Sequence, residues 1–241
     1  MAPAPGWFLP SREEGLANER KFAGDASAEP AVAAMLDALL LPDRYHPEDR
    51  VNSVYFDTHD LRGLAEKENG DNLKTKIRLR WYGRPGEISG EVPAFLEAKH
   101  RVGAARRKVR VALTAPADWL VSVPLDDPSL AEFAARHAAA LGEPVMQDWT
   151  PTCCISYDRL RYNDLRGGSR VSVDWNVRAE RFNETLFPWA FPVELGEMVC
   201  EWKDRDGEPP FWAEAMLRAG LRLRSFSKYG ECMRRLVSGA P

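Results

Sequence analysis

With 241 residues, the chain is long enough to bury one sizeable core. Its formal net charge of −3 excludes the overall basic field of a generic nucleic-acid-binding protein, so any cationic surface must be local and we expect no nucleic-acid partner. No apolar run reaches the roughly 18 to 20 residues of a membrane-spanning helix, and the cysteine spacing fits neither a zinc motif nor a disulfide framework. We therefore expect a soluble, cytoplasmic protein with reduced thiols.

The chain begins with a Pro- and Ala-rich stretch, so residues 1–12 are predicted to be a flexible lead-in to a single domain at 13–241. Pro and Gly punctuation predicts helices at 30–41, 58–69, 118–141 and 211–219. Alternating apolar and polar residues predict strands near 52–57, 74–83, 92–101, 105–113, 151–162, 169–180 and 192–204. With a segment around Lys21, this makes about eight strands and indicates an α+β fold built on an antiparallel sheet.

The strand near 74–83 has one apolar face and one cationic face. Successive side chains of a strand point to opposite sides, so Lys76, Arg78 and Arg80 share one face while apolar residues take the other. The same pattern recurs in other predicted strands. Charged side chains share a face at Glu19 and Lys21, at Glu97 and Lys99, at Lys108 and Arg110, at Arg159 and Arg161, and at Glu201 and Lys203.

Two architectures agree with these charged faces. In a sandwich, the apolar faces meet inside and the charges are an ordinary exterior. In a closed barrel, the charges line the interior and the apolar faces pack outward against the predicted helices. A cationic interior persists only where anions or water occupy it, because burying unpaired cations costs several kcal/mol each. Asp174 is an interior carboxylate in the second case and a surface residue in the first.

Seven short motifs follow one another between about residue 18 and residue 235. They are Glu19-Arg-Lys-Phe22, Ser53-Val-Tyr-Phe-Asp-Thr58, Lys76-Ile-Arg-Leu-Arg-Trp-Tyr-Gly83, Phe95-Leu-Glu-Ala-Lys99, Tyr157-Asp-Arg159, Glu201-Trp-Lys203 and Ser227-Lys-Tyr229. Together they resemble the motifs of the VTC-type polyphosphate polymerase domain, a branch of the triphosphate tunnel (CYTH-like) superfamily.

The resemblance implies a closed eight-stranded antiparallel β-barrel with helices packed around the outside. It also implies transfer of the γ-phosphate of ATP to a growing inorganic polyphosphate chain, with pyrophosphate as a further partner and a divalent metal, Mn²⁺ or Mg²⁺, as cofactor. The resemblance gives catalytic phosphate contacts to Arg78, Arg80, Lys99, Arg159 and Lys228, further substrate contacts to Lys21 and Lys108, and the metal to Glu201. Strand phase adds Glu97 as a second metal ligand and Glu19, Lys203, Arg110 and Arg161 as substrate-binding residues.

One departure narrows the activity that the resemblance implies. Hydrolases and cyclases of the superfamily usually carry Glu-x-Glu-x-Lys on the first strand, but residue 17 is Ala in this chain, which favours the polymerase branch. Two alternatives stay open: a non-catalytic polyphosphate sensor or scaffold, and a hydrolase of tripolyphosphate or nucleoside triphosphates. Coupling of synthesis to membrane transport would need a separate membrane partner.

Overall fold

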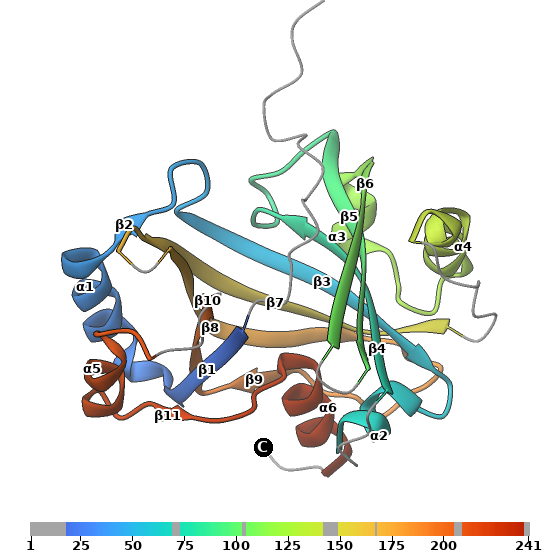
Figure 1. Ribbon diagram of the computed structural model, residues 1–241. Helices are drawn as coiled ribbons and strands as arrows, with labels where there is room; N and C mark the ends of the chain where they lie inside the picture. The colour runs from blue at the N-terminus through green and yellow to red at the C-terminus, as the bar shows by residue number, and fades with distance from the viewer. Residues whose placement is uncertain are drawn as a thin grey trace, which may run out of the picture.

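A computed structural model describes residues 18–68, 73–102, 105–141, 149–166, 168–204 and 209–238 of the protein (Figure 1). The predicted lead-in at 1–12 lies outside these residues. One antiparallel sheet of 11 strands dominates the described chain, with the order β11-β1-β10-β8-β7-β3-β4-β5-β6 and with β2 and β9 paired to β7 and β8. The strands are β1 Asn18–Asp25, β2 Leu41–Pro42, β3 Glu48–Thr58, β4 Leu73–Tyr82, β5 Glu91–Val102, β6 Ala105–Pro116, β7 Trp149–Asp164, β8 Ser169–Phe182, β9 Val193–Leu195, β10 Glu197–Asp204 and β11 Arg222–Leu223.

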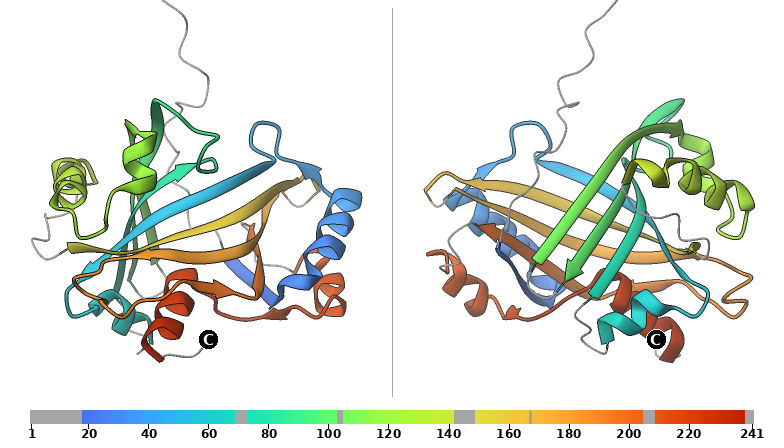
Figure 2. Two further views of the ribbon diagram at one scale, coloured as in Figure 1. Left: turned by 180° about the vertical axis from the view of Figure 1, so that it is seen from behind. Right: turned by 45° about the vertical axis from the view of Figure 1, so that its right-hand side comes forward.

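The prediction of a closed eight-stranded barrel is wrong. The sheet curls strongly (Figure 2), but in the described part of the chain no backbone pairing joins its last strand, β6, to β1 or β11 at the other end. The two ends meet through side chains instead, because Lys99 Nζ on β5 lies 3.0 Å from a carboxylate oxygen of Glu19 on β1. Alternation identified which residues share a face, whereas closure depends on how the end strands approach each other. Long charged side chains from both ends occupy the space between them.

Helices cover the convex face of the sheet in two places. Helices α1 (Glu29–Leu39) and α5 (Ala213–Arg218) pack over β1, β8 and β10, where Trp202 and Trp212 are buried. Helices α3 (Ala117–Ser122) and α4 (Pro128–Ala138) cover β4, β5 and β6, where Leu79 and Leu96 are buried. In these two places, helices lie against the apolar convex face of the sheet. Most of the structure is nevertheless strand.

Two predicted helices differ from the observed ones. The segment 118–141 forms α3, α4 and a short 3₁₀ turn at Ala139–Leu141, because Pro124 and Pro128 interrupt the helical hydrogen bonds. The helix predicted at 58–69 is α2, Arg62–Glu68, and it packs near one end of the concave side instead of on the convex face, with Leu64 in the core there.

The last helix was not predicted. Helix α6, Lys228–Ser238, packs against α2 and β9 with Tyr229, Cys232, Met233 and Leu236 buried (Figure 2). The apolar spacing of these four residues was a readable helical signal. The predicted strand at 192–204 divides at Gly196 into β9 and β10, which pair with opposite ends of β8.

All four cysteines are buried and free, as expected. None of the helices in the described ranges has the length and apolar character to span a membrane.

A cationic cavity on the concave face

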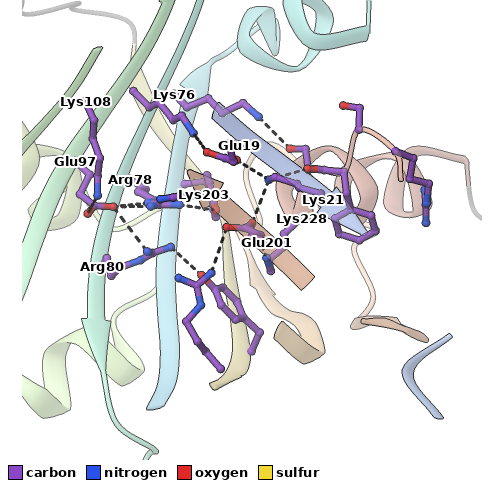
Figure 3. A pocket seen from close by; sticks show the side chains of 18 residues that line it. Glu19, Lys21, Lys76, Arg78, Arg80, Glu97, Lys108, Glu201, Lys203 and Lys228 are labelled. Atoms are coloured by element: carbon purple, nitrogen blue, oxygen red, sulfur yellow. Dashed lines mark hydrogen bonds and ion pairs between the residues drawn. The ribbon is translucent and has the colours of Figure 1, made fainter. Parts of the chain in front are cut away.

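The concave side of the sheet holds a cavity of about 500 Å³ (Figure 3). Seven strands (β1, β3, β4, β5, β6, β7 and β10) contribute lining side chains, and the segment 224–228 completes the wall. The lining consists of Glu19, Lys21, Tyr55, Lys76, Arg78, Arg80, Glu97, Lys99, Lys108, Tyr157, Arg159, Glu201, Lys203, Arg224, Ser225, Phe226, Ser227 and Lys228. The charged strand faces predicted from the sequence thus meet in one place.

On the β4–β6 side, one carboxylate organises several cations. Glu97 is 2% exposed, and its oxygens lie 2.6 Å from Arg78 Nη2, 3.1 Å from Lys108 Nζ and 3.0 Å from Arg110 Nε. Antiparallel register explains this, because Arg78, Glu97 and Arg110 stand directly opposite one another on β4, β5 and β6. Burial alone would raise the pKa of Glu97, but these cations and Arg80 hold it well below its usual value. Glu97 is therefore a fixed counter-charge among arginines and lysines.

On the β1–β10 side, two glutamates face the same lysine. Lys21 Nζ lies 3.2 Å from Glu19 Oε1 and 3.0 Å from Glu201 Oε1, and Lys21 stands opposite Glu201 in the register of the two strands. Burial and the neighbouring Glu201 would raise the pKa of Glu19, yet Lys21 and Lys99 outweigh them and lower it to about 2. Burial would also raise the pKa of Glu201, which Lys21, Lys228 and Arg159 instead hold well below its usual value. Both carboxylates are ionised at neutral pH.

Between these two sides, Asp174 on β8 holds two cations from beneath. Its carboxylate is fully buried and accepts hydrogen bonds from Arg159 Nε at 2.5 Å and from Lys228 Nζ at 2.5 Å. Burial would lower the pKa of Lys228, but Asp174 and Glu201 raise it overall, so the ammonium stays charged. The Lys228 ammonium also lies 4.5 Å above the ring of Tyr157. The sequence left open whether Asp174 is an interior or a surface residue, and the structure places it in the interior.

The remaining cations line the cavity closer to solvent. The side chains of Lys99 and Lys108 are 46% and 36% exposed, and burial of the rest of each side chain lowers the pKa of both. Lys76 Nζ donates to Ser227 Oγ at 3.0 Å, which ties β4 to the segment before α6. Lys99 and Lys108 therefore remain partly open to solvent.

Two predicted substrate-binding residues do not line the cavity. Arg110 lies behind Glu97, with its guanidinium 3.8 Å from the Phe95 ring and Nη2 donating to the Tyr82 hydroxyl. Arg161 shares the strand phase of Arg159 but pairs with Asp49 and donates to the carbonyl of His46 at 3.0 Å. All the other predicted site residues line the cavity.

The sequence analysis missed two lining cations. Lys76 had a readable signal, since it shares the strand phase of Arg78 and Arg80. Arg224 had none, because it belongs to a short irregular segment that only the tertiary structure brings to the cavity.

The carboxylates of the cavity could supply part of the ligand shell of a divalent metal ion, with oxygens of a bound phosphate supplying the rest. In the described ranges, no three His, Cys, Asp or Glu side chains gather closely enough to hold a metal ion by themselves. Mg²⁺ in phosphate-binding enzymes is commonly held by one or two carboxylates, with substrate oxygens and waters completing the shell. Glu19 and Glu201, two ionised carboxylates beside one lysine, match that donor set. Glu97 matches it poorly, since four cations already surround it.

The fold and the cavity define a class of protein: a curled antiparallel sheet whose concave face carries a cavity lined mainly by Lys and Arg side chains. A family model for the VTC domain matches residues 17–237. The chain therefore belongs to the VTC domain family, as its motifs indicated.

Solved structures offer more distant likenesses. The chain is similar to a candidate adenylate cyclase from Bacillus halodurans, with 12% sequence identity, a TM-score of 0.47, and coverage of 87% of this chain and 92% of that chain. It is also similar to a conserved hypothetical protein from Pyrococcus furiosus, with 13% identity, a TM-score of 0.43, and coverage of 90% and 99%. At these TM-scores neither likeness carries an argument about function. No curated protein matches the chain.

Proposed function

We propose that the domain is a polyphosphate polymerase, which transfers the γ-phosphate of ATP to the end of an inorganic polyphosphate chain bound in the same cavity. The observation that carries the proposal is the charge of the cavity lining: ten Lys and Arg side chains face three glutamates, an excess of seven cations. Two carboxylates outside the lining, Asp174 behind Arg159 and Lys228 and Glu197 beside Arg224, reduce the excess to five. Such an excess favours dense negative charge.

The size of the excess favours two phosphate chains over one. ATP carries about four negative charges at neutral pH, since its terminal phosphate bears up to two and each inner phosphate bears one. A single ATP therefore leaves a cavity cation without an anionic partner, whereas ATP and a pyrophosphate or polyphosphate end together match or exceed the excess. Two bound chains are what a transfer reaction requires, and a hydrolase needs only one.

The chemistry needs no nucleophile from the protein. Phosphoryl transfer is governed by alignment of the reacting oxygens and by neutralisation of charge on the non-bridging oxygens. Arg78 and Arg80 are suited to grip one phosphate each through two parallel hydrogen bonds, while Lys21, Lys99 and Lys228 act as compact charges. The terminal phosphate of the acceptor chain is the attacking group, and its oxygen replaces the bridging oxygen to the ADP leaving group.

Glu201 and Glu19 are the residues that would hold a Mn²⁺ or Mg²⁺ ion. Such an ion supplies further neutralisation of the phosphate oxygens. Lys21 contacts both glutamates, so its ammonium offsets the repulsion between the two carboxylates when no metal ion is bound.

Incubation of the purified protein with ATP, pyrophosphate and Mn²⁺, followed by electrophoresis of the products, tests the proposal. We expect ladders of long-chain polyphosphate. Release of inorganic phosphate without ladders would replace the proposal with a hydrolase, and binding of polyphosphate with neither product would replace it with a sensor or scaffold. A variant carrying Arg78→Ala and Arg159→Ala is the control, because it should make no polymer.

A further inference from the structure

Outside the cavity, Asp57 lies at the junction between α2 and α6. Its side chain is 1% exposed and accepts hydrogen bonds from the backbone N–H groups of Thr58, Gly63 and Leu64 at 2.8, 2.7 and 3.0 Å. A fourth donor, the hydroxyl of Tyr229, reaches it at 2.8 Å from the first turn of α6. Burial and the adjacent carboxylate raise the pKa of Tyr229, so its hydroxyl keeps the proton that it donates.

The backbone around Asp57 is adapted to this carboxylate. A Cβ at Gly63 would come within 3.0 Å of an Asp57 oxygen, so a larger residue there would crowd it. Leu61, at the start of the same turn, has a φ of 54°, a conformation that a leucine holds only where its surroundings impose it. The chain thus accepts local backbone strain to place this carboxylate under α6.

Tyr229 joins Asp57 to the cavity in two ways. It is the residue after Lys228, so a buried ring held at this position constrains the same turn of α6 that carries the Lys228 side chain. Its ring also stacks on Tyr55, with centroids 5.2 Å apart, and the Tyr55 hydroxyl accepts a hydrogen bond from Arg78 Nη1 at 3.3 Å. One buried side chain therefore supports two cavity cations that come from different elements.

We propose that Asp57 is a positioning residue for the phosphate site: through the Tyr229 hydroxyl it holds α6 so that Lys228 points into the cavity. The inference rests on the proposed function only for the ligand, a phosphate chain. Asp57 and the Tyr229 hydroxyl contact no ligand themselves. Their effect on binding therefore depends on the presence of the Lys228 ammonium.

A double-mutant cycle read by calorimetric titration of inorganic tripolyphosphate tests this dependence. Tyr229→Phe retains the ring and its stacking on Tyr55 and removes only the hydrogen bond to Asp57. We expect it to weaken tripolyphosphate binding about three- to tenfold, which is the range of one buried hydrogen bond. In a Lys228→Ala background, the same change should have almost no further effect on the dissociation constant.

Tyr162→Phe is the matched control. Tyr162 is also buried and donates its hydroxyl hydrogen to an aspartate, Asp37, at 3.0 Å, but it lies in the core beneath α1 and away from the cavity. Tyr162→Phe should lower the melting temperature about as much as Tyr229→Phe does, but it should leave tripolyphosphate binding unchanged. Asp57→Asn, which keeps the shape of the side chain, should reproduce the binding loss of Tyr229→Phe.

Two results would overturn the inference. One is a Tyr229→Phe variant that loses thermal stability yet binds tripolyphosphate like the wild type. The other is an equal loss of affinity in both backgrounds, which would mean that Tyr229 does not act through Lys228. Absence of tripolyphosphate binding by the wild-type protein would instead reject the proposed function, so the two failures can be told apart.

Discussion

Two buried charge networks lie on opposite faces of the same strands, and only one of them lines the cationic cavity. On the convex side, Asp158 of β7 pairs with Arg50 and Arg84 at 3.3 and 2.9 Å and accepts a hydrogen bond from the Asn176 amide at 2.8 Å. On the concave side, ten Lys and Arg side chains and three glutamates line a cavity of about 500 Å³.

The comparison shows that charge on a strand face is a weak indication of a site. The convex network is compact, with the carboxylate enclosed by its donors, so it stabilises the fold. The concave network contains more cations than its carboxylates can neutralise, and they face open space. The ratio of cations to carboxylates, together with a cavity beside them, distinguishes a binding site from a structural ion network. Variants in the concave network should lose phosphate binding, and variants in the convex network should lose stability.

The largest expected effect is on synthesis. Glu201→Gln should abolish polymer formation because it removes a carboxylate that would hold the metal, while the solvated cavity tolerates the neutral amide. Gel analysis of products and circular dichroism of the variant measure both properties. Glu214→Gln, on the exposed surface of α5, is the control and should synthesise normally. Full synthesis by Glu201→Gln would remove Glu201 from the metal site.

Asp158→Ala should have the largest effect on stability. It leaves Arg50 without its carboxylate partner in a partly buried position, and breaking a buried pair from one side costs about 3 to 5 kcal/mol. Urea unfolding measures the loss, and tripolyphosphate titration of the folded variant should match the wild type. A loss of phosphate affinity would mean that the convex network supports the cavity directly.

Arg78→Ala should weaken phosphate binding and leave stability almost unchanged. Loss of charge-assisted hydrogen bonds to a phosphate costs about 1.5 to 3 kcal/mol, or about ten- to a hundredfold in ATP affinity. Stability should change little, since Glu97 retains Arg80, Lys108 and Arg110.

Arg110→Ala is the matched control for Arg78→Ala, because both arginines pair with Glu97 and only Arg78 lines the cavity. Its ATP affinity should stay near that of the wild type. Equal losses of affinity in the two variants would place Arg110 in the binding site.

The smallest expected effect is on stability in acid. Glu19 has a pKa of about 2 in the folded protein against an ordinary value of 4.5, so it stabilises the fold above pH 4.5, and this contribution disappears as the pH falls towards 2. Glu97, Asp174 and Glu201, whose pKa values are also lowered, add to the same trend. Melting temperatures of wild type and Glu19→Gln between pH 7 and pH 2 should converge in acid. If the melting temperatures of the two proteins stayed equally far apart at every pH, the lowered pKa of Glu19 would be contradicted.

Much of the site could be predicted from the sequence because strand alternation is strictly local. Arg78, Arg80, Lys99, Lys108, Arg159 and Glu201 stand on the concave face as their phase required. Phase alone did not separate Arg159 from Arg161, since the second arginine lies nearer the end of β7 and is captured by Asp49. The interior place of Asp174 depended on which face of β8 was concave.

The way in which the two ends of the open sheet approach each other could not be predicted from the same signals. It depends on contacts between Glu19 and Lys99, which are 80 residues apart in the chain. The cavity wall at Arg224 and the contact of Asp57 with Tyr229 likewise arise from tertiary contacts between segments without a common periodicity. The resemblance to the VTC family supplied the expectation of a complete barrel, and this chain departs from it.

Phosphoryl transfer inside the cavity requires that it hold two phosphate chains at once. Calorimetric titration of pyrophosphate into protein saturated with Mn²⁺ and a non-hydrolysable ATP analogue tests it most directly. We expect pyrophosphate to bind to the saturated protein while the analogue remains bound. Displacement of the analogue by pyrophosphate, with a single shared site, would contradict it.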